Sequence, residues 1–455
     1  MSIFRAYDIR GIVGEDLTVD IVHQLGKAIG SEARARQQTQ IAVGRDGRLS
    51  GAELSQALIN GILSTGCDVI DVGRVPTPVL YFATHHLNTH SGVMVTGSHN
   101  PANYNGFKIV LAKQTLAGEA IQALAQRIEN KNFVTGSGQL SQHDVQAAYK
   151  AQIVGDSKIK RGLHAVVDCG NGVAGELAPQ LLTELGCQVT PLYCEIDGHF
   201  PNHHPDPSVP ANLVDLQKTV IAQNADIGLA FDGDGDRLGV VDNTGEIIWA
   251  DRQMMLYARD ILQRHQGAHC IYDVKCSRHL ATEIQQAGGV PVMWKTGHSF
   301  MKAKLQSDDK ALLAGEMSGH IFFKERWYGF DDGLYTAARL IEILSQQQDS
   351  AAEIFARLPN AVNTPELKLE LNEYGEQFVL MDKIRASFSF PDAECHTLDG
   401  LRVEFKEGWG LVRPSNTTPC LVLRFEADHD AALQAIQAQF KSQFLALDNS
   451  LVLPF

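Results

Sequence analysis

The feature that most constrains the fold is a repeated change from a short apolar run to a glycine-rich polar loop. It occurs where GVMV leads into TGSHNP (92–101), where IGLAF leads into DGDGDR (227–237), and where ALLAG leads into EMSGH (311–320). Ligands of open α/β sheets bind beside the carboxyl ends of strands. The pattern therefore predicts three α/β units, each of which presents one polar loop to a ligand.

Periodicity extends this prediction to the whole chain. A length of 455 residues exceeds one ordinary core, because domains typically hold about 100 to 200 residues. Beyond about residue 358 the α/β alternation gives way to LRVEFKEGWGLVRPS and CLVLRFEAD, which predict antiparallel strands. We predict three similar α/β mixed-sheet domains and a C-terminal α+β domain around a central cleft, with domains at 1–145, 146–246, 247–358 and 359–455.

Composition excludes several classes of protein. The 39 basic and 53 acidic residues leave a formal net charge of -14, which disfavours nucleic acid and anionic membranes as partners. No signal-like segment begins the sequence, and no apolar run approaches the roughly 20 residues of a membrane helix. The eight cysteines show no CxxC or zinc spacing, so we expect reduced thiols and a cytoplasmic location.

DGDGDR predicts a metal site. Asp232, Asp234 and Asp236 alternate with glycines that let the backbone curve, so three carboxylates can converge on one cation. Such hard oxygen ligands favour magnesium or calcium over zinc. A calcium EF-hand does not fit, because Arg237 stands at the position that needs glycine and Asn243 at the position that needs glutamate. Three carboxylates leave positions on Mg²⁺ open for a phosphate oxygen.

Ser98 in TGSHNP is a candidate nucleophile, because it follows an apolar run and lies where backbone amides can surround its hydroxyl. Taken alone, the loop also fits an ordinary turn or helix-cap serine. A serine hydrolase fits poorly, since the GxSxG elbow is missing.

GNGVAG (170–175) matches the G-x-G-x-x-G pattern of dinucleotide-binding folds, with Glu195 about 20 residues further on. This short glycine pattern is weak evidence, and an NAD enzyme would leave DGDGDR unexplained. We interpret it as a tight turn from a strand into a helix.

Two further loops suit a phosphorylated sugar. In GEMSGH, residues Glu316, Ser318 and His320 are two apart, so an extended segment would point all three side chains toward sugar hydroxyls. In RPSNTTP (413–419) a guanidinium, hydroxyls and turn amides could hold a phosphate. Either loop could instead be a structural turn.

Together RAYDIRG (5–11), TGSHNPANYNGFK (96–108), DGDGDR, GEMSGH and RPSNTTP resemble the α-D-phosphohexomutase family, in order and at comparable separations over nearly the whole chain. The forms TGSHNP and GEMSGH resemble its bacterial phosphomannomutase/phosphoglucomutase branch, whereas the phosphoglucosamine mutase branch typically reads ASHNP and GEQSGH.

The resemblance implies a phosphoserine at Ser98 and Mg²⁺ bound by the three aspartates and a phosphoserine oxygen. It implies sugar contacts at Glu316 and Ser318 and a phosphate clamp of Arg413, Ser415, Asn416 and Thr417. It also places a further set of residues along the family's cleft: Tyr7, Arg10, His99, Lys108, Arg237, Lys275 and His298.

The implied reaction interconverts hexose 6-phosphate and hexose 1-phosphate, with mannose and glucose as expected substrates. Phosphorylated Ser98 would give its phosphoryl group to the sugar. The hexose 1,6-bisphosphate would then turn end for end in the site and return its other phosphate to Ser98. Lys108 or His99, and less favourably His298, would accept the hydroxyl proton. The alternatives are a phosphoglucosamine mutase, a metal-dependent sugar phosphatase, or a non-catalytic sugar-phosphate sensor. We expect a monomer or small homo-oligomer.

Overall fold

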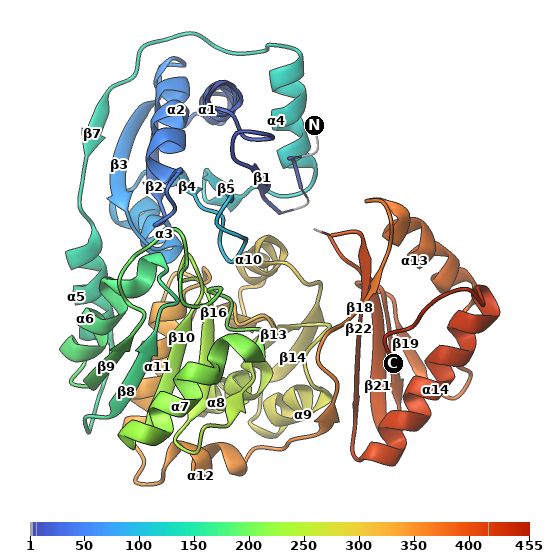
Figure 1. Ribbon diagram of the computed structural model, residues 1–455. Helices are drawn as coiled ribbons and strands as arrows, with labels where there is room; N and C mark the ends of the chain where they lie inside the picture. Colours follow the sequence, from blue (N-terminus) through green and yellow to red (C-terminus); the bar gives the residue numbers. More distant parts are fainter. Residues whose placement is uncertain (1–2, 6, 417) are drawn as a thin grey trace. The chain divides into compact units, whose positions relative to one another are not determined.

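The computed structural model describes residues 3–5, 7–416 and 418–455 (Figure 1). The chain forms two compact units. The larger unit contains Met1–Gln253 and His298–Arg357, and the smaller unit contains Met254–Gly297 and Leu358–Phe455. No helix among the described residues is both long enough and apolar enough to cross a membrane.

The first part of the larger unit is a mixed sheet with strand order β1-β5-β4-β2-β3-β7, in which β6 also pairs with β5. Strand β2 runs parallel to β3 and β4, whereas β5 runs antiparallel to β4. The strands are β1 (Ile9–Ile12), β2 (Gln40–Arg45), β3 (Asp68–Arg74), β4 (Gly92–Val95), β5 (Tyr104–Leu111), β6 (Gln114–Thr115) and β7 (Leu140–Gln142). The helices are α1 (Val19–Ala35), α2 (Gly51–Leu63), α3 (Thr77–His86) and α4 (Glu119–Glu129).

Every residue of β4 is buried, as its continuous apolar sequence predicts. Strand β4 ends at Val95, so the TGSHNP loop begins at the carboxyl end of this strand.

A second mixed sheet has the order β12-β11-β10-β8-β9, with β10 parallel to β8 and antiparallel to β11. All five residues of β10 are buried, and DGDGDR connects β10 to β11. The elements are α5 (Gln146–Asp156), β8 (His164–Asp168), η1 (Val173–Gly175), α6 (Leu177–Glu184), β9 (Gln188–Leu192), η2 (Pro210–Leu213), α7 (Val214–Gln223), β10 (Ile227–Phe231), β11 (Leu238–Asp242) and β12 (Ile247–Ile248). GNGVAG is a turn between β8 and α6, as interpreted from the sequence.

The larger unit also contains the antiparallel pair β15 and β16, which flanks the EMSGH loop. The helix that follows is buried along its whole length, and Asp332 caps its amino end by accepting from Tyr335 N. These elements are α10 (His298–Ser307), β15 (Ala311–Gly315), β16 (Ile321–Phe323), α11 (Gly333–Ser345) and α12 (Ala351–Ala356). Helix α8 (Ala250–Arg264) contains the boundary between the two units.

The smaller unit contains a parallel strand pair and an antiparallel sheet of order β17-β22-β21-β20-β19, with β18 also paired to β22. Helices α13 and α14 pack against this sheet (Figure 1). The elements are β13 (His269–Asp273), α9 (Arg278–Gln286), β14 (Val290–Trp294), β17 (Val362–Asn363), β18 (Leu367–Glu370), α13 (Glu376–Ser387), β19 (Glu394–His396), β20 (Leu401–Phe405), β21 (Gly408–Pro414), β22 (Cys420–Ala427) and α14 (Asp430–Leu447). Arg413 and Pro414 of RPSNTTP end β21, and Ser415 and Asn416 follow this strand.

Candidate active site

Ser98 lies against the DGDGDR loop within the larger unit. Its side chain is buried, and its Oγ donates a hydrogen bond of 3.1 Å to Asp232 Oδ2. The residue has a φ of +47°, a left-handed conformation that is uncommon for residues other than glycine. Such local strain persists only where the surrounding structure enforces it, and it is concentrated at functional sites. The structure thus joins the sequence-predicted nucleophile to the sequence-predicted metal loop.

Arg48, which was not predicted from the sequence, binds the backbone of the Ser98 loop. Its buried guanidinium donates to the backbone carbonyls of Ser98 (2.8 Å), Pro101 (2.6 Å) and Tyr104 (2.9 Å), and also to Asn100 O. A planar group with five N–H donors can bridge several acceptors at once. Arg48 therefore fixes the path of the loop on both sides of the candidate nucleophile.

Asp46, which was also not predicted, accepts hydrogen bonds from residues of the same loop. Its Oδ2 accepts from Thr96 Oγ1 (2.7 Å) and Gly97 N (3.2 Å), and it lies 3.4 Å from Arg48 Nε. A signal was present in the sequence, since GRDGR follows the apolar run of β2 as the other polar loops follow theirs. GRDGR carries no catalytic motif, and its side chains bind the Ser98 loop.

The three aspartates of DGDGDR fit a divalent cation. All three side chains are fully buried, and one carboxylate oxygen from each lies within 4.8 Å of the others. Oδ1 of Asp234 and Oδ1 of Asp236 have no hydrogen-bond partner among the described residues. Burial and repulsion from its two neighbours raise the pKa of Asp232 well above its usual range. Three buried carboxylates at this spacing match the preference of magnesium for hard oxygen ligands.

Lys108 binds the second carboxylate oxygen, Oδ2, of both Asp234 and Asp236. Its Nζ donates to Asp234 Oδ2 at 2.7 Å and to Asp236 Oδ2. Burial would lower the pKa of Lys108, but the two carboxylates raise it well above its usual range. Lys108 is therefore protonated in this arrangement, and it supplies positive charge rather than a base.

His99 is the neutral group beside Ser98. Its Nδ1 lies 3.3 Å from Ser98 Oγ. Burial and the nearby guanidinium groups of Arg237 and Arg10 lower the pKa of His99 well below its usual range. An uncharged imidazole at this distance can accept a proton from the serine hydroxyl.

Arg237 and Arg10 bring further positive charge to the larger unit's site. Arg237 Nε lies 3.7 Å from Asp232 Oδ2 and 3.3 Å from His320 Nε2. Arg10 donates to Asp8 Oδ2 at 2.5 Å and to Asn100 Oδ1 at 3.2 Å, so it reaches the Ser98 loop.

The EMSGH segment is a turn, so the expectation of an extended segment was wrong. Glu316 N donates to His320 O at 2.9 Å, and Gly319 N donates to Glu316 O at 3.0 Å. The side chains nevertheless converge, because His320 Nδ1 lies 2.8 Å from Ser318 Oγ and 3.2 Å from Glu316 Oε2. Hydrogen bonds between nearby backbone groups form the turn, and the spacing of polar residues in the sequence does not predict them.

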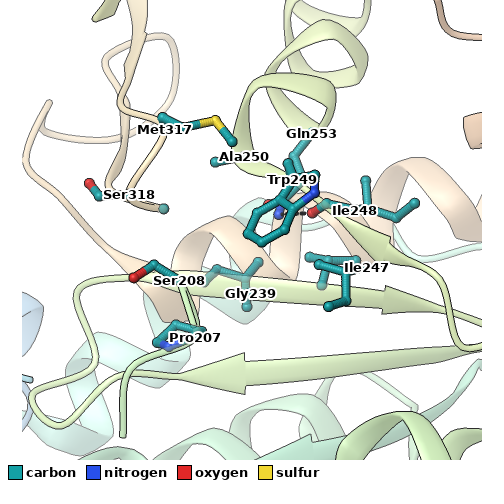
Figure 2. A pocket seen from close by; sticks show the side chains of 13 residues that line it. Pro207, Ser208, Gly239, Ile247, Ile248, Trp249, Ala250, Gln253, Met317 and Ser318 are labelled. Atoms are coloured by element: carbon teal, nitrogen blue, oxygen red, sulfur yellow. Dashed lines mark hydrogen bonds between the residues drawn. The ribbon is translucent and has the colours of Figure 1, made fainter. Parts of the chain in front are cut away.

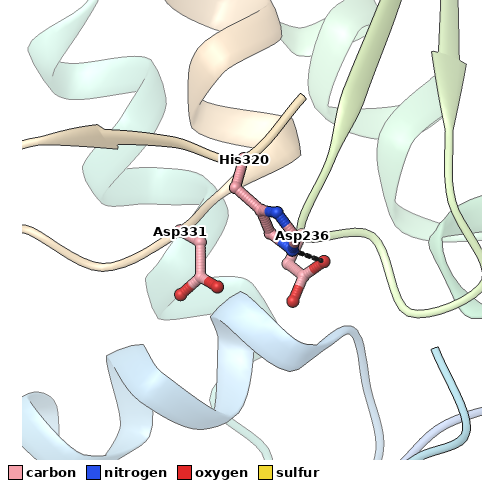
Figure 3. A group of neighbouring side chains, drawn as sticks. All are labelled: Asp236, His320 and Asp331. Atoms are coloured by element: carbon pink, nitrogen blue, oxygen red, sulfur yellow. Dashed lines mark ion pairs between the residues drawn. The ribbon is translucent and has the colours of Figure 1, made fainter. Parts of the chain in front are cut away.

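His320 links this turn to the metal loop. Its Nε2 lies 3.4 Å from Asp236 Oδ1, and Figure 3 shows the two side chains together with Asp331. Burial and Arg237 would lower the pKa of His320, but Asp236 and Glu316 outweigh them and raise it to about 9. His320 is therefore cationic in this arrangement.

Asp331, a further residue missed from the sequence, holds His298. It accepts from Lys302 Nζ at 2.8 Å, and its Oδ2 lies 3.4 Å from His298 Nδ1. Asp236, His320 and Asp331 also bring one potential ligand atom each within 4.8 Å of the others, but Lys302 already pairs with Asp331. Burial and Lys302 lower the pKa of His298, which keeps its imidazole neutral. Tyr7 contacts the His298 ring edge-on at 6.4 Å between centroids.

A shallow pocket lies on the other side of the EMSGH turn (Figure 2). It is lined by residues that include Met317, Ser318 and Trp249. Its lining contains neither Ser98 nor an aspartate of DGDGDR, so it is separate from the candidate reacting groups.

The remaining predicted residues lie in the smaller unit. Arg413 Nε donates to Asp399 Oδ2 at 3.1 Å, and Lys275 Nζ donates to Glu366 Oε1 at 2.6 Å. Gln377 Nε2 donates to Ser415 O at 3.1 Å, and Tyr374 Oη donates to Asn416 O at 3.1 Å. Thr417 lies outside the described residues.

Comparison with known proteins assigns the chain to a family. Four phosphoglucomutase/phosphomannomutase domain models match in order: α/β/α domain I (1–135), domain II (145–245), domain III (249–362) and the C-terminal domain (361–443). These matches confirm the predicted fold class.

Similar proteins extend over the whole chain. A phosphomannomutase/phosphoglucomutase of Pseudomonas aeruginosa is 56% identical over 454 residues, covering 100% of this chain and 98% of that protein. A phosphoglucomutase of Neisseria meningitidis is 53% identical over 444 residues, covering 97% of this chain and 96% of that protein. A crystal structure of a phosphoglucomutase/phosphomannomutase family protein from Burkholderia thailandensis has a TM-score of 0.95 at 53% identity, and covers 100% of this chain and 99% of its own. The chain belongs to the phosphoglucomutase/phosphomannomutase family and is a hexose phosphate mutase, an isomerase, as its sequence predicts.

Proposed function

We propose that this mutase interconverts the 6- and 1-phosphates of mannose and of glucose through a phosphorylated Ser98 and a hexose 1,6-bisphosphate. The observation that carries the proposal is the 3.1 Å contact between Ser98 Oγ and Asp232. It places the hydroxyl of a residue with a left-handed backbone beside a cluster of three buried carboxylates. The names of the relatives, which include both phosphomannomutase and phosphoglucomutase, support activity on both sugars.

In the first half-reaction a hydroxyl of the sugar phosphate attacks phosphorus on Ser98, and the bond from phosphorus to Ser98 Oγ breaks. The proton that the sugar hydroxyl releases reaches the serine oxygen through His99, whose neutral imidazole lies 3.3 Å from that oxygen. In the second half-reaction Ser98 attacks the other phosphate of the bisphosphate, and His99 takes the serine proton back. His298 is the remaining neutral candidate for the proton of the sugar hydroxyl, since Lys108 is protonated.

Phosphoryl transfer depends mainly on positioning and on neutralisation of charge. Asp232, Asp234 and Asp236 would hold Mg²⁺, which when bound would neutralise charge on the transferring phosphoryl group. Lys108, Arg237 and Arg10 contribute fixed positive charge around Ser98. Glu316 and Ser318 would bind sugar hydroxyls through the turn that also orients His320.

The smaller unit would bind the phosphate that is not reacting. Arg413 and Lys275 are buried cations, and Ser415 and Asn416 follow Arg413 in one polar connection between strands. Thr417 remains part of the proposed clamp on sequence grounds. One clamp can serve both orientations of the substrate, because a 1,6-bisphosphate presents a phosphate at each end.

We also propose the domain division at 1–145, 146–246, 247–358 and 359–455, which the matched ranges of the family models support. A cytoplasmic location is supported by the eight cysteines, all of which are free thiols. Phosphosugars are the proposed partners, and a monomer or small homo-oligomer is the proposed state.

The function is tested by incubating the enzyme with Mg²⁺, a trace of glucose 1,6-bisphosphate and either glucose 1-phosphate or mannose 1-phosphate. The expected product is the 6-phosphate of each sugar without release of inorganic phosphate. Free phosphate without the 6-phosphate would instead identify a phosphatase. A rate with glucosamine 1-phosphate above both hexoses would favour the phosphoglucosamine mutase alternative.

Removal of the metal should stop the reaction. Chelation should abolish activity and added Mg²⁺ should restore it, and Asp234→Asn should lower kcat by about 10²-fold or more because one hard anionic ligand is lost. Calorimetry should show weaker Mg²⁺ binding by this variant. Asp242→Asn is the matched control, since Asp242 is a buried aspartate that caps a turn through Thr244. Equal losses in both variants would contradict the metal assignment.

Arg413→Lys should raise KM for the sugar phosphate by about 10-fold and change kcat little, because lysine keeps the charge but loses the planar fork that binds phosphate. Initial-rate kinetics with both sugar 1-phosphates would measure this. Arg385→Lys, on α13 of the same unit, should leave KM unchanged. An unchanged KM for Arg413→Lys would remove Arg413 from the clamp.

A further inference from the structure

Two cysteines meet at the ends of neighbouring strands in the larger unit. Strands β8 and β9 run parallel with Asp168 opposite Leu192, and Cys169 and Cys194 follow them. The two Sγ atoms lie 3.7 Å apart. We propose that Cys169 and Cys194 form a covalent modification site, a dithiol that reacts with a hydroperoxide and closes into a reversible intramolecular disulfide.

The two thiols differ in a way that assigns their roles. Cys194 is partly exposed, whereas Cys169 is fully buried. The hydrogen bond with Cys169 lowers the pKa of Cys194, although burial opposes this, and the same bond together with burial raises the pKa of Cys169. Asp168, which is paired with His203 at 3.0 Å, disfavours both thiolates. Because a hydroperoxide can reach the partly exposed thiol and not the buried one, Cys194 attacks first and Cys169 resolves.

The chemistry balances with one hydroperoxide as the oxidant. The Cys194 thiolate attacks the terminal oxygen, so that an S–O bond forms, the O–O bond breaks and the alkoxide leaves as an alcohol after protonation. Cys169 then attacks the sulfenic sulfur, so that the S–S bond forms and the S–O bond breaks, and the hydroxide leaves as water with the Cys169 proton. Overall, two thiols and one hydroperoxide give a disulfide, an alcohol and water.

The backbone around this dithiol is constrained and packs on the metal loop. A Cβ at Gly175 would lie 2.0 Å from Cys194 O, so the GNGVAG turn approaches the Cys194 backbone closely. Val173 N donates to Gly233 O at 3.1 Å, and a Cβ at Gly233 would lie 2.3 Å from Ser98 O. A continuous series of backbone contacts thus runs from the cysteines to Ser98.

We expect disulfide formation to strain this series, because the sulfurs have to approach from 3.7 Å to a bond of about 2.0 Å. Misplacement of reacting groups by about 1 Å can cost up to about 10²-fold in rate. We therefore expect the oxidised enzyme to be slower by about 10-fold or more. The disulfide itself does not depend on the proposed function, whereas its effect on the rate rests on the proposed role of Ser98.

The experiment uses the full chain carrying Cys395→Ser, which removes the exposed thiol in the smaller unit. After treatment with a small excess of hydrogen peroxide, intact mass should fall by two hydrogen atoms, and non-reducing peptide mapping should link residues 169 and 194. Dithiothreitol should restore both the mass and the mutase rate. No loss of two hydrogens, or a link between other cysteines, would overturn the proposal.

Single variants test the assigned roles. In Cys169→Ser the peroxide should leave a sulfenic acid on Cys194 that dimedone labels, whereas Cys194→Ser should give no label at Cys169. A label at Cys169 instead would reverse the assignment and overturn the mechanism. If the disulfide forms but the rate is unchanged in an enzyme that Ser98→Ala inactivates, the coupling to the active site is wrong although the proposed function stands.

Discussion

Ser98→Ala should abolish mutase activity, with a fall in kcat of at least about 10⁴-fold. The residue lies in a left-handed conformation, with its Oγ 3.1 Å from Asp232 and 3.3 Å from His99, and alanine removes the oxygen that would carry the phosphoryl group. The fold should be little affected, since only one hydroxyl is lost. A coupled assay of glucose 6-phosphate formation would measure the rate.

Intact mass provides the second measurement for this variant. The wild-type enzyme incubated with hexose 1,6-bisphosphate should gain one phosphoryl group, and alkaline phosphatase should remove it. Ser98→Ala should gain none. Ser91→Ala is a suitable control, because Ser91 is a buried serine at the start of β4, on the opposite end of the strand. A phosphoryl group that is retained in Ser98→Ala would place the carrier elsewhere in the chain.

Arg48→Ala should lower both activity and stability, although Arg48 touches no reacting atom. Loss of the guanidinium frees four carbonyls of the Ser98 loop and leaves Asp46 as a buried charge without its partner. We expect the free energy of unfolding to fall by about 3–5 kcal/mol. The rate should fall by about 10²-fold, because the loop no longer holds Ser98 in place. Denaturant titration and initial-rate kinetics measure the two effects.

Arg48→Lys separates positioning from charge. Lysine keeps the positive charge beside Asp46 but has no planar fork to bridge the carbonyls, so kcat should stay low while part of the stability returns. Arg339→Lys is the control for general destabilisation, since Arg339 is a fully buried arginine in α11 that pairs with Glu325. If Arg48→Lys and Arg339→Lys lose activity to the same extent at equal stability, Arg48 has no special role in positioning Ser98.

Much of the site could be predicted because its chemistry is local in sequence. DGDGDR places three carboxylates within five residues after a buried strand, and the structure brings their oxygens to within 4.8 Å. The family and mutase function were predicted from five short motifs and the fold class from the alternation of strands and helices, and comparison confirms all three. The roles of the individual site residues remain predictions.

What escaped prediction depends on pairs of residues that are distant in the chain. Lys108 was a candidate base in the sequence, yet it lies between Asp234 and Asp236, and these carboxylates raise its pKa. The role of Arg48 could not be predicted, because no local sequence pattern indicates that its guanidinium binds carbonyls some 50 residues further along the chain. The EMSGH turn closes through backbone hydrogen bonds that residue alternation does not encode.

The sequence by itself determined which reactive groups exist and that the TGSHNP, DGDGDR and EMSGH loops each follow an apolar strand, because apolar runs and glycine-rich loops are properties of short segments. The tertiary structure alone decided how these groups are charged and held. Burial and nearby charges keep Lys108 protonated and His99 neutral. The hydrogen bond from Arg48 to the Ser98 carbonyl likewise requires the two residues to be within a few ångströms of each other. Only folding brings those neighbours within range.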